Sequence, residues 1–222
     1  MRVLRIVIAQ ILMCVVAVGC SPALKEPTQA FLAVLMRASA EPNPTEHQLD
    51  SARQVVDTRL SILLDPNPEV SVSDGGLLVV IVDTPEAREL IKTSIEPGYY
   101  RFLDSESSLP IGSISPMDAN VILTSDDITR AEAILTTAGG WQIDLEFDDR
   151  GRSALAQYST RNLGHYLILT KDNEVVASLH PEIPVLDGRA TIVGIDQPLV
   201  RIIAAQLESG SLPDGLTLTV EP

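Results

Sequence analysis

The residues of this sequence that could carry chemistry are few and scattered. Its three histidines are His47, His165 and His180, and none stands at a spacing typical of a catalytic or metal-binding pair. Ser178 has no base near it in the sequence, and no HExxH, GxSxG or Walker pattern occurs. A half-exposed strand histidine, as expected at His165, and a loop histidine before a proline, as at His180, are usually structural. The sequence therefore predicts a protein that is not an enzyme and that needs no cofactor.

Three carboxylates follow one another at every second position in the segment WQIDLEFDD. Asp144, Glu146 and Asp148 would share one face of a strand, while Trp141 and the apolar residues between them would face the core. Carboxylate oxygens at this spacing could gather a calcium ion. A solvated outer face of a sheet gives the same pattern and is the favoured interpretation, so no metal site is predicted.

The first 20 residues combine a basic start, a short apolar middle and small residues before a cysteine. Arg2 and Arg5 precede the apolar run at 6–18, which is shorter than the roughly 20 residues that a membrane-spanning helix requires. This order is typical of a secretory signal. The pattern therefore predicts export from the cytoplasm.

The end of this segment resembles the lipobox of bacterial lipoproteins, whose cysteine becomes acylated and forms the new N-terminus. Val18 and Gly19 precede Cys20, although Ala17 stands where that family usually has leucine. An uncleaved short anchor and plain secretion are the alternatives. Cleavage before Cys20 would remove Cys14, and acylation would consume Cys20, which leaves no thiol for a disulfide or a cysteine site. We expect a signal peptide at 1–20 and lipid anchoring at Cys20 on the extracytoplasmic face of a bacterial membrane.

The composition is that of a globular, acidic protein. Hydrophobic residues make up 45% and charged residues 21% of the 222 positions, and the formal net charge is −14. Nucleic acids and anionic lipid surfaces both attract basic patches, so neither is an expected direct partner. The most apolar later runs, at 76–82 and 166–170, have the length of strands.

The first half of the chain has the pattern of a small two-layer unit. After a polar tether at 21–30, a helix is predicted with Asn43 as N-cap, Pro44 at its first position and Glu46 completing a capping box. The other predicted elements are a strand at 31–36, a hairpin from 69 to 82, a helix opened by Pro85 and a strand at 99–103. The order β-α-β-β-α-β is that of a ferredoxin-like motif, which we assign to a base subdomain at 31–105.

A loop rich in Ser, Pro and Gly, at 104–116, separates this unit from a second one at 117–213. In the second unit a helix is predicted to start at Ser125, with Asp126 and Asp127 at its positive end. The remaining predicted elements are strands at 120–124, 141–148, 166–170, 174–179 and 189–195, a helix closed by Gly164 and a helix at 197–208. A final strand at 214–222 would return to the base. The expected fold class is therefore α+β with two subdomains.

A spaced series of glycines, turn residues and small or apolar residues runs through the second unit: Gly151, Leu155, Ser159, Asn162, Gly164, Asp172, Asn173, Val175, Ala177, Ser178, Leu179, Gly188, Ile192 and Gly194. This series resembles the head subdomain of the first periplasmic domain of SecD, a membrane component of bacterial protein export. LTSDDITRA at 123–131 and LESGSLP at 207–213 extend it on both sides. Residues 52–103 resemble the base subdomain more weakly, through Ala52, Arg59, Leu60 and the strand Tyr100-Arg101-Phe102. Leu179 departs from the family, which has a proline there.

The resemblance implies a function outside the membrane. SecD proteins continue into transmembrane helices that, with SecF, couple proton flow to pulling on the exported chain, whereas this sequence ends at Pro222. We therefore expect a lipid-anchored module that binds emerging or unfolded polypeptide and assists export without proton coupling. Its expected partners are secretory precursors and the Sec translocon, bound through sheet edges and apolar grooves between the subdomains. The alternative is an envelope lipoprotein that uses the same fold to bind one specific partner.

Overall fold

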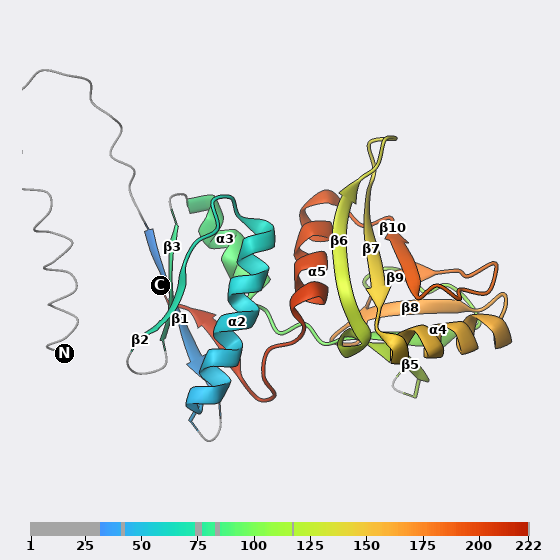
Figure 1. The fold of residues 1–222 in the computed structure, drawn as a ribbon, viewed down its shortest axis with the longest axis horizontal. Helices are drawn as coiled ribbons and strands as arrows, with labels where there is room; N and C mark the ends of the chain where they lie inside the picture. The colour runs from blue at the N-terminus through green and yellow to red at the C-terminus, as the bar shows by residue number, and fades with distance from the viewer. Residues whose placement is uncertain (1–31, 41–42, 74–76, 83–84, 117, 222) are drawn as a thin grey trace, which may run out of the picture. The chain divides into compact units, whose positions relative to one another are not determined.

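The computed structural model describes residues 32–40, 43–73, 77–82, 85–116 and 118–221 (Figure 1). The predicted signal peptide, the lipobox with Cys20 and the tether lie outside these residues. Within the described part, helices and strands alternate in the mixed α+β architecture that the sequence predicts. No helix in the described part is both long and apolar enough to cross a membrane.

The base is a four-stranded antiparallel sheet with two helices packed on one face (Figure 1). Its elements are β1 (Leu32–Ser39), α2 (Glu46–Leu63), β2 (Val70–Ser73), β3 (Leu77–Val82), α3 (Pro85–Ser94) and β11 (Thr217–Val220). The strand order is β11-β1-β3-β2. Ala52 and Leu60 from α2, Ile91 from α3 and Leu78 and Val80 from β3 are buried together in one core.

The fourth strand of the base comes from the C-terminal end of the chain. The sequence pattern placed the strand predicted at 99–103 in this position, and that prediction was wrong; the structure has a strand at Tyr100–Ser105. This strand, β4, pairs with β5 and β8 in another sheet, whereas β11 pairs with β1. Tyr100 and Phe102 are buried in the core of the second unit. Their alternation predicts a half-buried strand, but it cannot predict which sheet the strand joins.

The start of α2 also differs from the prediction. Thr45, and not Asn43, is the N-cap: its Oγ1 accepts a hydrogen bond from the N–H of Gln48 at 3.2 Å, and the Gln48 side chain accepts one from the N–H of Thr45 at 3.0 Å. Both Asn43 and Thr45 have a suitable partner three positions later, Glu46 and Gln48, but a capping box begins with serine or threonine, and the structure forms it at Thr45.

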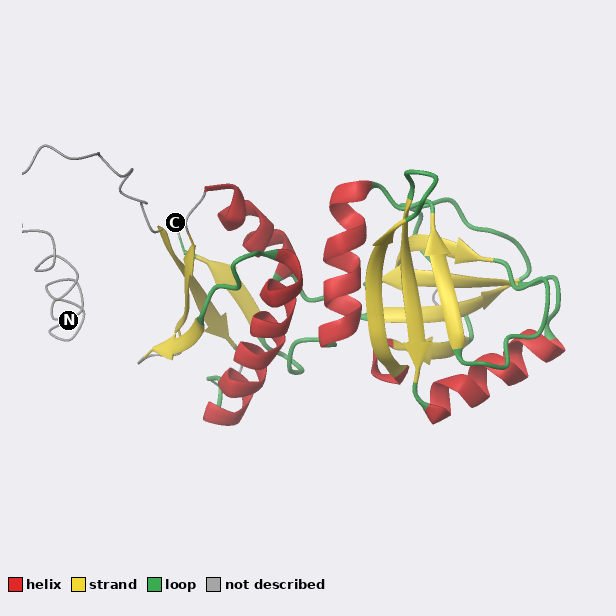
Figure 2. Ribbon diagram, turned by 45° about the horizontal axis from the view of Figure 1, so that its top comes forward, coloured by secondary structure: helices red, strands yellow, loops and turns green. Residues whose placement is uncertain are grey.

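The second unit packs two sheets against each other, with two helices (Figure 2). Its elements are β4 (Tyr100–Ser105), β5 (Val121–Thr124), η1 (Ser125–Asp127), β6 (Ile128–Leu135), β7 (Trp141–Phe147), α4 (Asp149–Arg161), β8 (Tyr166–Lys171), β9 (Glu174–Leu179), β10 (Arg189–Val193) and α5 (Gln197–Ser209). The sheets have the orders β10-β7-β6 and β5-β4-β8-β9. We call this unit the head.

The helix predicted at Ser125 is a single 3-10 turn followed by the long strand β6. The carboxylate of Asp127 accepts a hydrogen bond from the N–H of Thr124 at 2.8 Å and so caps this turn. Beyond it, β6 pairs with β7, with Ala131 opposite Leu145 and Ala133 opposite Ile143. The acids at 126 and 127 resemble a helix start, but pairing with β7 overrides that local preference.

The predicted alternation of β7 is confirmed, and two turns follow from their residue types. Ile143, Leu145 and Phe147 of β7 are buried, in the predicted alternation. Asp172 and Asn173 have positive φ angles of 50° and 76° and form the two-residue turn between β8 and β9. Gly210 ends α5 with a φ of 74°.

Candidate functional site

Arg59 stands at the junction of base and head, where the chain passes between them twice, near 95–99 and near 210–216. It lies on α2, and its side chain is 0% exposed. Nη1 donates to the carbonyl oxygen of Ser94 at 2.7 Å, Nη2 to that of Gly210 at 2.8 Å, and Nε to Oγ of Ser209 at 2.9 Å. One side chain of the base subdomain therefore binds at both segments that join the base to the head. Burial lowers the pKa of Arg59 to about 10.

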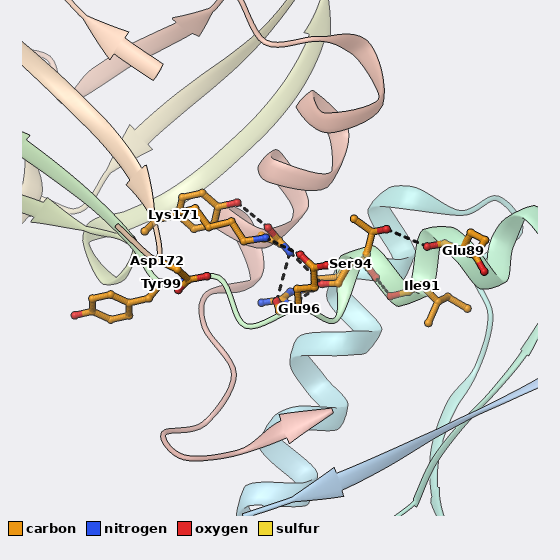
Figure 3. Close-up of polar contacts among 11 residues, drawn as sticks. Glu89, Ile91, Ser94, Glu96, Tyr99, Lys171 and Asp172 are labelled. Atoms are coloured by element: carbon orange, nitrogen blue, oxygen red, sulfur yellow. Dashed lines mark hydrogen bonds and ion pairs between the residues drawn. The ribbon is translucent and has the colours of Figure 1, made fainter. Parts of the chain in front are cut away.

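Residues from the head complete this junction. The hydroxyl of Tyr100 donates to Oε1 of Gln206 at 2.6 Å, and Nε2 of Gln206 donates to the carbonyl of Ser94 at 3.3 Å. Lys171 of the head pairs with Glu96 at 3.2 Å (Figure 3). Burial raises the pKa of Tyr100, although the positive charge of Arg59 opposes this shift. The buried polar groups are thus paired with one another, which favours a single arrangement of the junction.

Apolar contacts between α2 and α5 lie next to these bonds. Leu63 of α2 packs with Ile202 and Ala205 of α5 in a small buried cluster. Arg201 donates from Nη2 to the carbonyl oxygens of Ile62 and Leu63, both at 3.1 Å. These carbonyls end α2, where a cation is favoured.

A hollow of about 490 Å³ opens beside this junction, and we call it the groove. Its apolar lining comes from the loop before β5, from β9, from the connection between β10 and α5, and from α5: Ile111, Ile114, Val175, Val176, Ile195, Leu199, Ile202 and Ile203. Its polar lining includes Thr93 and Glu96 from the base side and Lys171, Asp172, Glu174, Asp196 and Gln206 from the head. Ile114 is 73% exposed at its margin. The groove thus offers apolar side chains to a ligand, with charges at the rim.

A second hollow, of about 640 Å³, lies along β10, and we call it the β10 hollow. It is lined by β9 from Ala177 to Leu179, by His180 and Pro181, and by β10. The loop at 180–188 continues from it and carries the exposed side chains of Ile183 and Leu186. The N–H of Val185 donates to Oγ of the buried Ser159 at 2.9 Å, which attaches this loop to α4.

The histidines and Ser178 have structural contacts. Nδ1 of His165 lies 2.9 Å from Oδ1 of Asp104, and the hydroxyl of Tyr158 donates to the same oxygen at 3.0 Å. The hydroxyl of Ser178 donates to the carbonyl of Leu109 at 3.2 Å, not to a histidine. His180 stacks on Tyr166 with the ring centroids 4.5 Å apart, and His47 is exposed on α2.

The three carboxylates along β7 are each engaged locally. Asp144 accepts from Thr191 Oγ1 at 2.9 Å, Glu146 pairs with Arg189 at 2.8 Å, and Asp148 caps α4 by accepting from the N–H of Gly151 at 2.7 Å. No group of three potential metal ligands occurs among the described residues.

The sequence located part of this arrangement and missed its centre. A hollow with two lining residues from the base side lies beside the junction, while its expected role in binding stays a prediction, and Leu179 lines the β10 hollow. Arg59 was noted only for its resemblance to the base of SecD. An arginine within the apolar face of a helix, between Val56 and Leu60, is the signal that could have revealed its burial.

Comparison with known proteins gives the same family in each case. Residues 105–214 match the family model of the SecDF P1 head subdomain. The protein translocase subunit SecD of Thermobaculum terrenum is 29% identical over 92 residues, which are 41% of this chain and 18% of that protein. The SecD subunit of Acidaminococcus fermentans is 30% identical over 98 residues, 44% of this chain and 24% of that protein. The match therefore spans a quarter or less of either relative.

Solved structures share the fold over a longer stretch. A structure of SecDF, described as a membrane component that enhances protein export, aligns with 86% of this chain and 99% of its own, at 23% identity and a TM-score of 0.65. SecDF in a super-membrane-facing form aligns with 90% of this chain and 32% of its own, at 21% identity and a TM-score of 0.70. At these identities the likeness shows the fold alone. The matched segment and the two relatives thus show that the head is similar to that of SecD proteins, and the solved structures show that the longer stretch shares the fold of SecDF.

Proposed function

We propose that the protein is a membrane-tethered, extracytoplasmic SecD-like module that binds emerging or unfolded polypeptide and thereby assists protein export. The observation that carries this proposal is the groove, which lies within a SecD-like fold and exposes Ile111, Ile114 and Leu199 at its margin. Apolar side chains gathered at a concave surface are typical of a binding site. An unfolded chain presents apolar side chains of varied shape, which such a groove can accept.

The protein is proposed to hold the exported polypeptide by binding it, without proton coupling. A polypeptide bound outside the membrane is hindered from sliding back, and this effect needs no ion pathway. No catalytic chemistry is needed either, which agrees with the structural contacts of His165 and Ser178.

Photocrosslinking in cells tests the proposal. A photoreactive amino acid would replace Ile114 at the groove and, separately, Ile183 in the head loop, each of which is 73% exposed. Val72, on β2 of the base and 41% exposed, is the control site. We expect many secretory precursors, together with translocon subunits, to be captured from 114 and 183 and few from 72. A single recurrent envelope protein in place of precursors would favour the dedicated interaction module and refute the export role.

We also propose that lipid attached to Cys20 supplies the tether. The support is the lipobox-like order of residues before this cysteine. Cys20→Ser should abolish labelling by a radioactive fatty acid and leave a precursor of unchanged length. Normal labelling of the variant would contradict the anchor and leave the binding proposal standing.

A further inference from the structure

The strand β10 has one edge paired and one edge open. Among the residues that the structure describes, it pairs with β7 alone, at the end of the sheet β10-β7-β6. The N–H of Phe147 donates to the carbonyl of Gly188 at 2.9 Å, and this bond fixes the phase of the pairing. Because main-chain groups alternate along an antiparallel strand, those of Ile192 face β7, and those of Thr191 and Val193 face away from it. Both outward residues are exposed, and the side chain of Val193 is 65% exposed.

At two other sheet edges of the head, other parts of the chain bind main-chain groups of the edge strand. Along β9, the N–H of Gly112 donates to the carbonyl of Val175, and the N–H of Val175 donates to the carbonyl of Ser113, both at 2.8 Å. On β6, the N–H of Ala131 donates to the carboxylate of Glu208. Uncovered strand edges attract further strands, and proteins usually block them. The open edge of β10 is thus a place where an added strand can pair.

The β10 hollow and the groove follow each other along this edge. Thr191 and Val193 line the β10 hollow, and the next residue, Gly194, lines the groove. On β9 the same division falls between Val176, in the groove, and Ala177, in the β10 hollow. A strand placed along β10 would therefore have room for side chains at both hollows, while its main chain pairs with Thr191 and Val193.

The charges at the groove indicate which chain would bind. The charged residues that line it are Glu96, Lys171, Asp172, Glu174 and Asp196. Lys171 is paired with Glu96, and Asp172 accepts a hydrogen bond from the N–H of Tyr99. Glu174 and Asp196 are exposed and have no ion pair among the described residues. The β10 hollow is lined by one acidic and one basic residue, Asp187 and Arg189, and Arg189 is paired with Glu146. The net negative charge at the groove thus favours a cationic side chain.

We propose that the bound polypeptide adds to β10 as an extra strand, and that it is an extended apolar segment carrying lysine or arginine at the groove end. This inference rests on the proposed function and specifies how and where the polypeptide binds. Main-chain hydrogen bonds supply affinity that does not depend on sequence, and the acidic groove supplies a preference for cationic segments.

Peptide binding to the full-length protein in mild detergent tests this mode. The probe is a short fluorescent peptide of alternating leucine and serine with one terminal lysine, and its partner has glutamate in place of lysine. Two further peptides carry N-methyl groups on alternate residues. One is methylated at the odd positions and the other at the even positions, so that each has one blocked edge. Strand addition uses one edge of the peptide, so one N-methylated peptide should bind roughly tenfold more weakly and the other should bind normally. The lysine peptide should bind more tightly than the glutamate peptide, and added salt should reduce the difference.

Protein variants supply the matching test. Thr191→Pro and Val193→Pro each remove an outward N–H, and proline is tolerated at such edge positions. Thr191→Val and Val193→Thr change the side chain and keep the donor, so they are the controls. Each proline variant should lower peptide affinity roughly tenfold while circular dichroism stays unchanged, and the controls should bind normally.

The outcomes separate the two proposals. Equal binding of both N-methylated peptides would overturn strand addition and leave polypeptide binding intact. If a proline variant is misfolded, the peptide comparison on the wild-type protein still decides the question. If the unmodified lysine and glutamate peptides both fail to bind the wild-type protein, the proposed function itself is refuted.

Discussion

Arg59 of α2 donates from Nη1 to the carbonyl oxygen of Ser94 at 2.7 Å, across a separation of 35 residues in the sequence. The same guanidinium reaches Ser209 and Gly210 on the other connection between base and head. A planar group with five donors can serve several acceptors at once, which a lysine cannot do with the same geometry. The junction beside the groove therefore depends on one side chain.

Replacing this arginine should weaken the whole fold. Arg59→Met keeps much of the buried volume and leaves the Ser94 and Gly210 carbonyls with fewer donors, so we expect a loss of about 3 kcal/mol in the free energy of unfolding. Urea denaturation measures it. Arg53→Met is the control on the same helix, since Arg53 pairs only with the exposed Asp50, and it should cost about 0.5 kcal/mol or less. Equal losses in the two variants would show that the Arg59 bonds contribute nothing specific.

Stability at high pH should depend on Tyr158. Burial, followed by the hydrogen bond to Asp104, raises the pKa of Tyr158 above its usual value. The folded protein then keeps a proton that the unfolded chain releases, so this stabilisation is complete below about pH 10 and is lost as the pH rises through the raised pKa.

The measurement compares Tyr158→Phe with the wild type in urea between about pH 8 and pH 11. The variant should lose less stability than the wild type above about pH 10. Tyr100, whose pKa is also raised, and Arg59, whose pKa is lowered to about 10 and whose contribution has the opposite sign, are present in both proteins and cancel in the difference. Parallel pH profiles would contradict the assignment.

Removing one buried hydroxyl should loosen the head loop at 180–188. Ser159→Ala removes the acceptor of the Val185 N–H, and we expect amide hydrogen exchange at Val185 to rise roughly tenfold or more. Thr160→Ala is the control, because the exposed Thr160 hydroxyl donates only to the carbonyl of Ala156 in its own helix. If exchange at Val185 were unchanged by Ser159→Ala, other contacts would have to hold the loop.

A glycine in α4 is required by close packing. A Cβ added at Gly151 would lie 3.0 Å from the Cβ and carbonyl oxygen of Asp127 and 3.0 Å from the Cβ of Phe147. Gly→Ala within a helix usually stabilises, but here none of these atoms can move freely, so Gly151→Ala should lower the melting temperature, with a cost of about 1–3 kcal/mol. At Gly140 the nearest atom is Oγ1 of Thr136 at 3.7 Å, and Gly140→Ala should be nearly neutral. A gain in melting temperature for Gly151→Ala would refute the packing argument.

Some features could be read from the sequence because their causes are local. The alternation of β7 follows from the two-residue period of a strand, and the turn at Asp172-Asn173 follows from the tolerance of these residues for positive φ. The SecD-like positions from Gly151 to Gly194 were recognisable for the same reason, since many are turn or cap residues.

Choices between distant partners could not be read in this way. The sequence by itself determined that a strand lies near 99–103 and that the head has the SecD pattern. Only the tertiary structure decided that this strand joins β8, that Ile128–Leu135 is a strand and not a helix, and that Arg59 is buried. Local patterns fix backbone conformation and the face that is buried, whereas the partner of a strand, or the acceptors of a buried cation, depends on which residues the whole fold brings together.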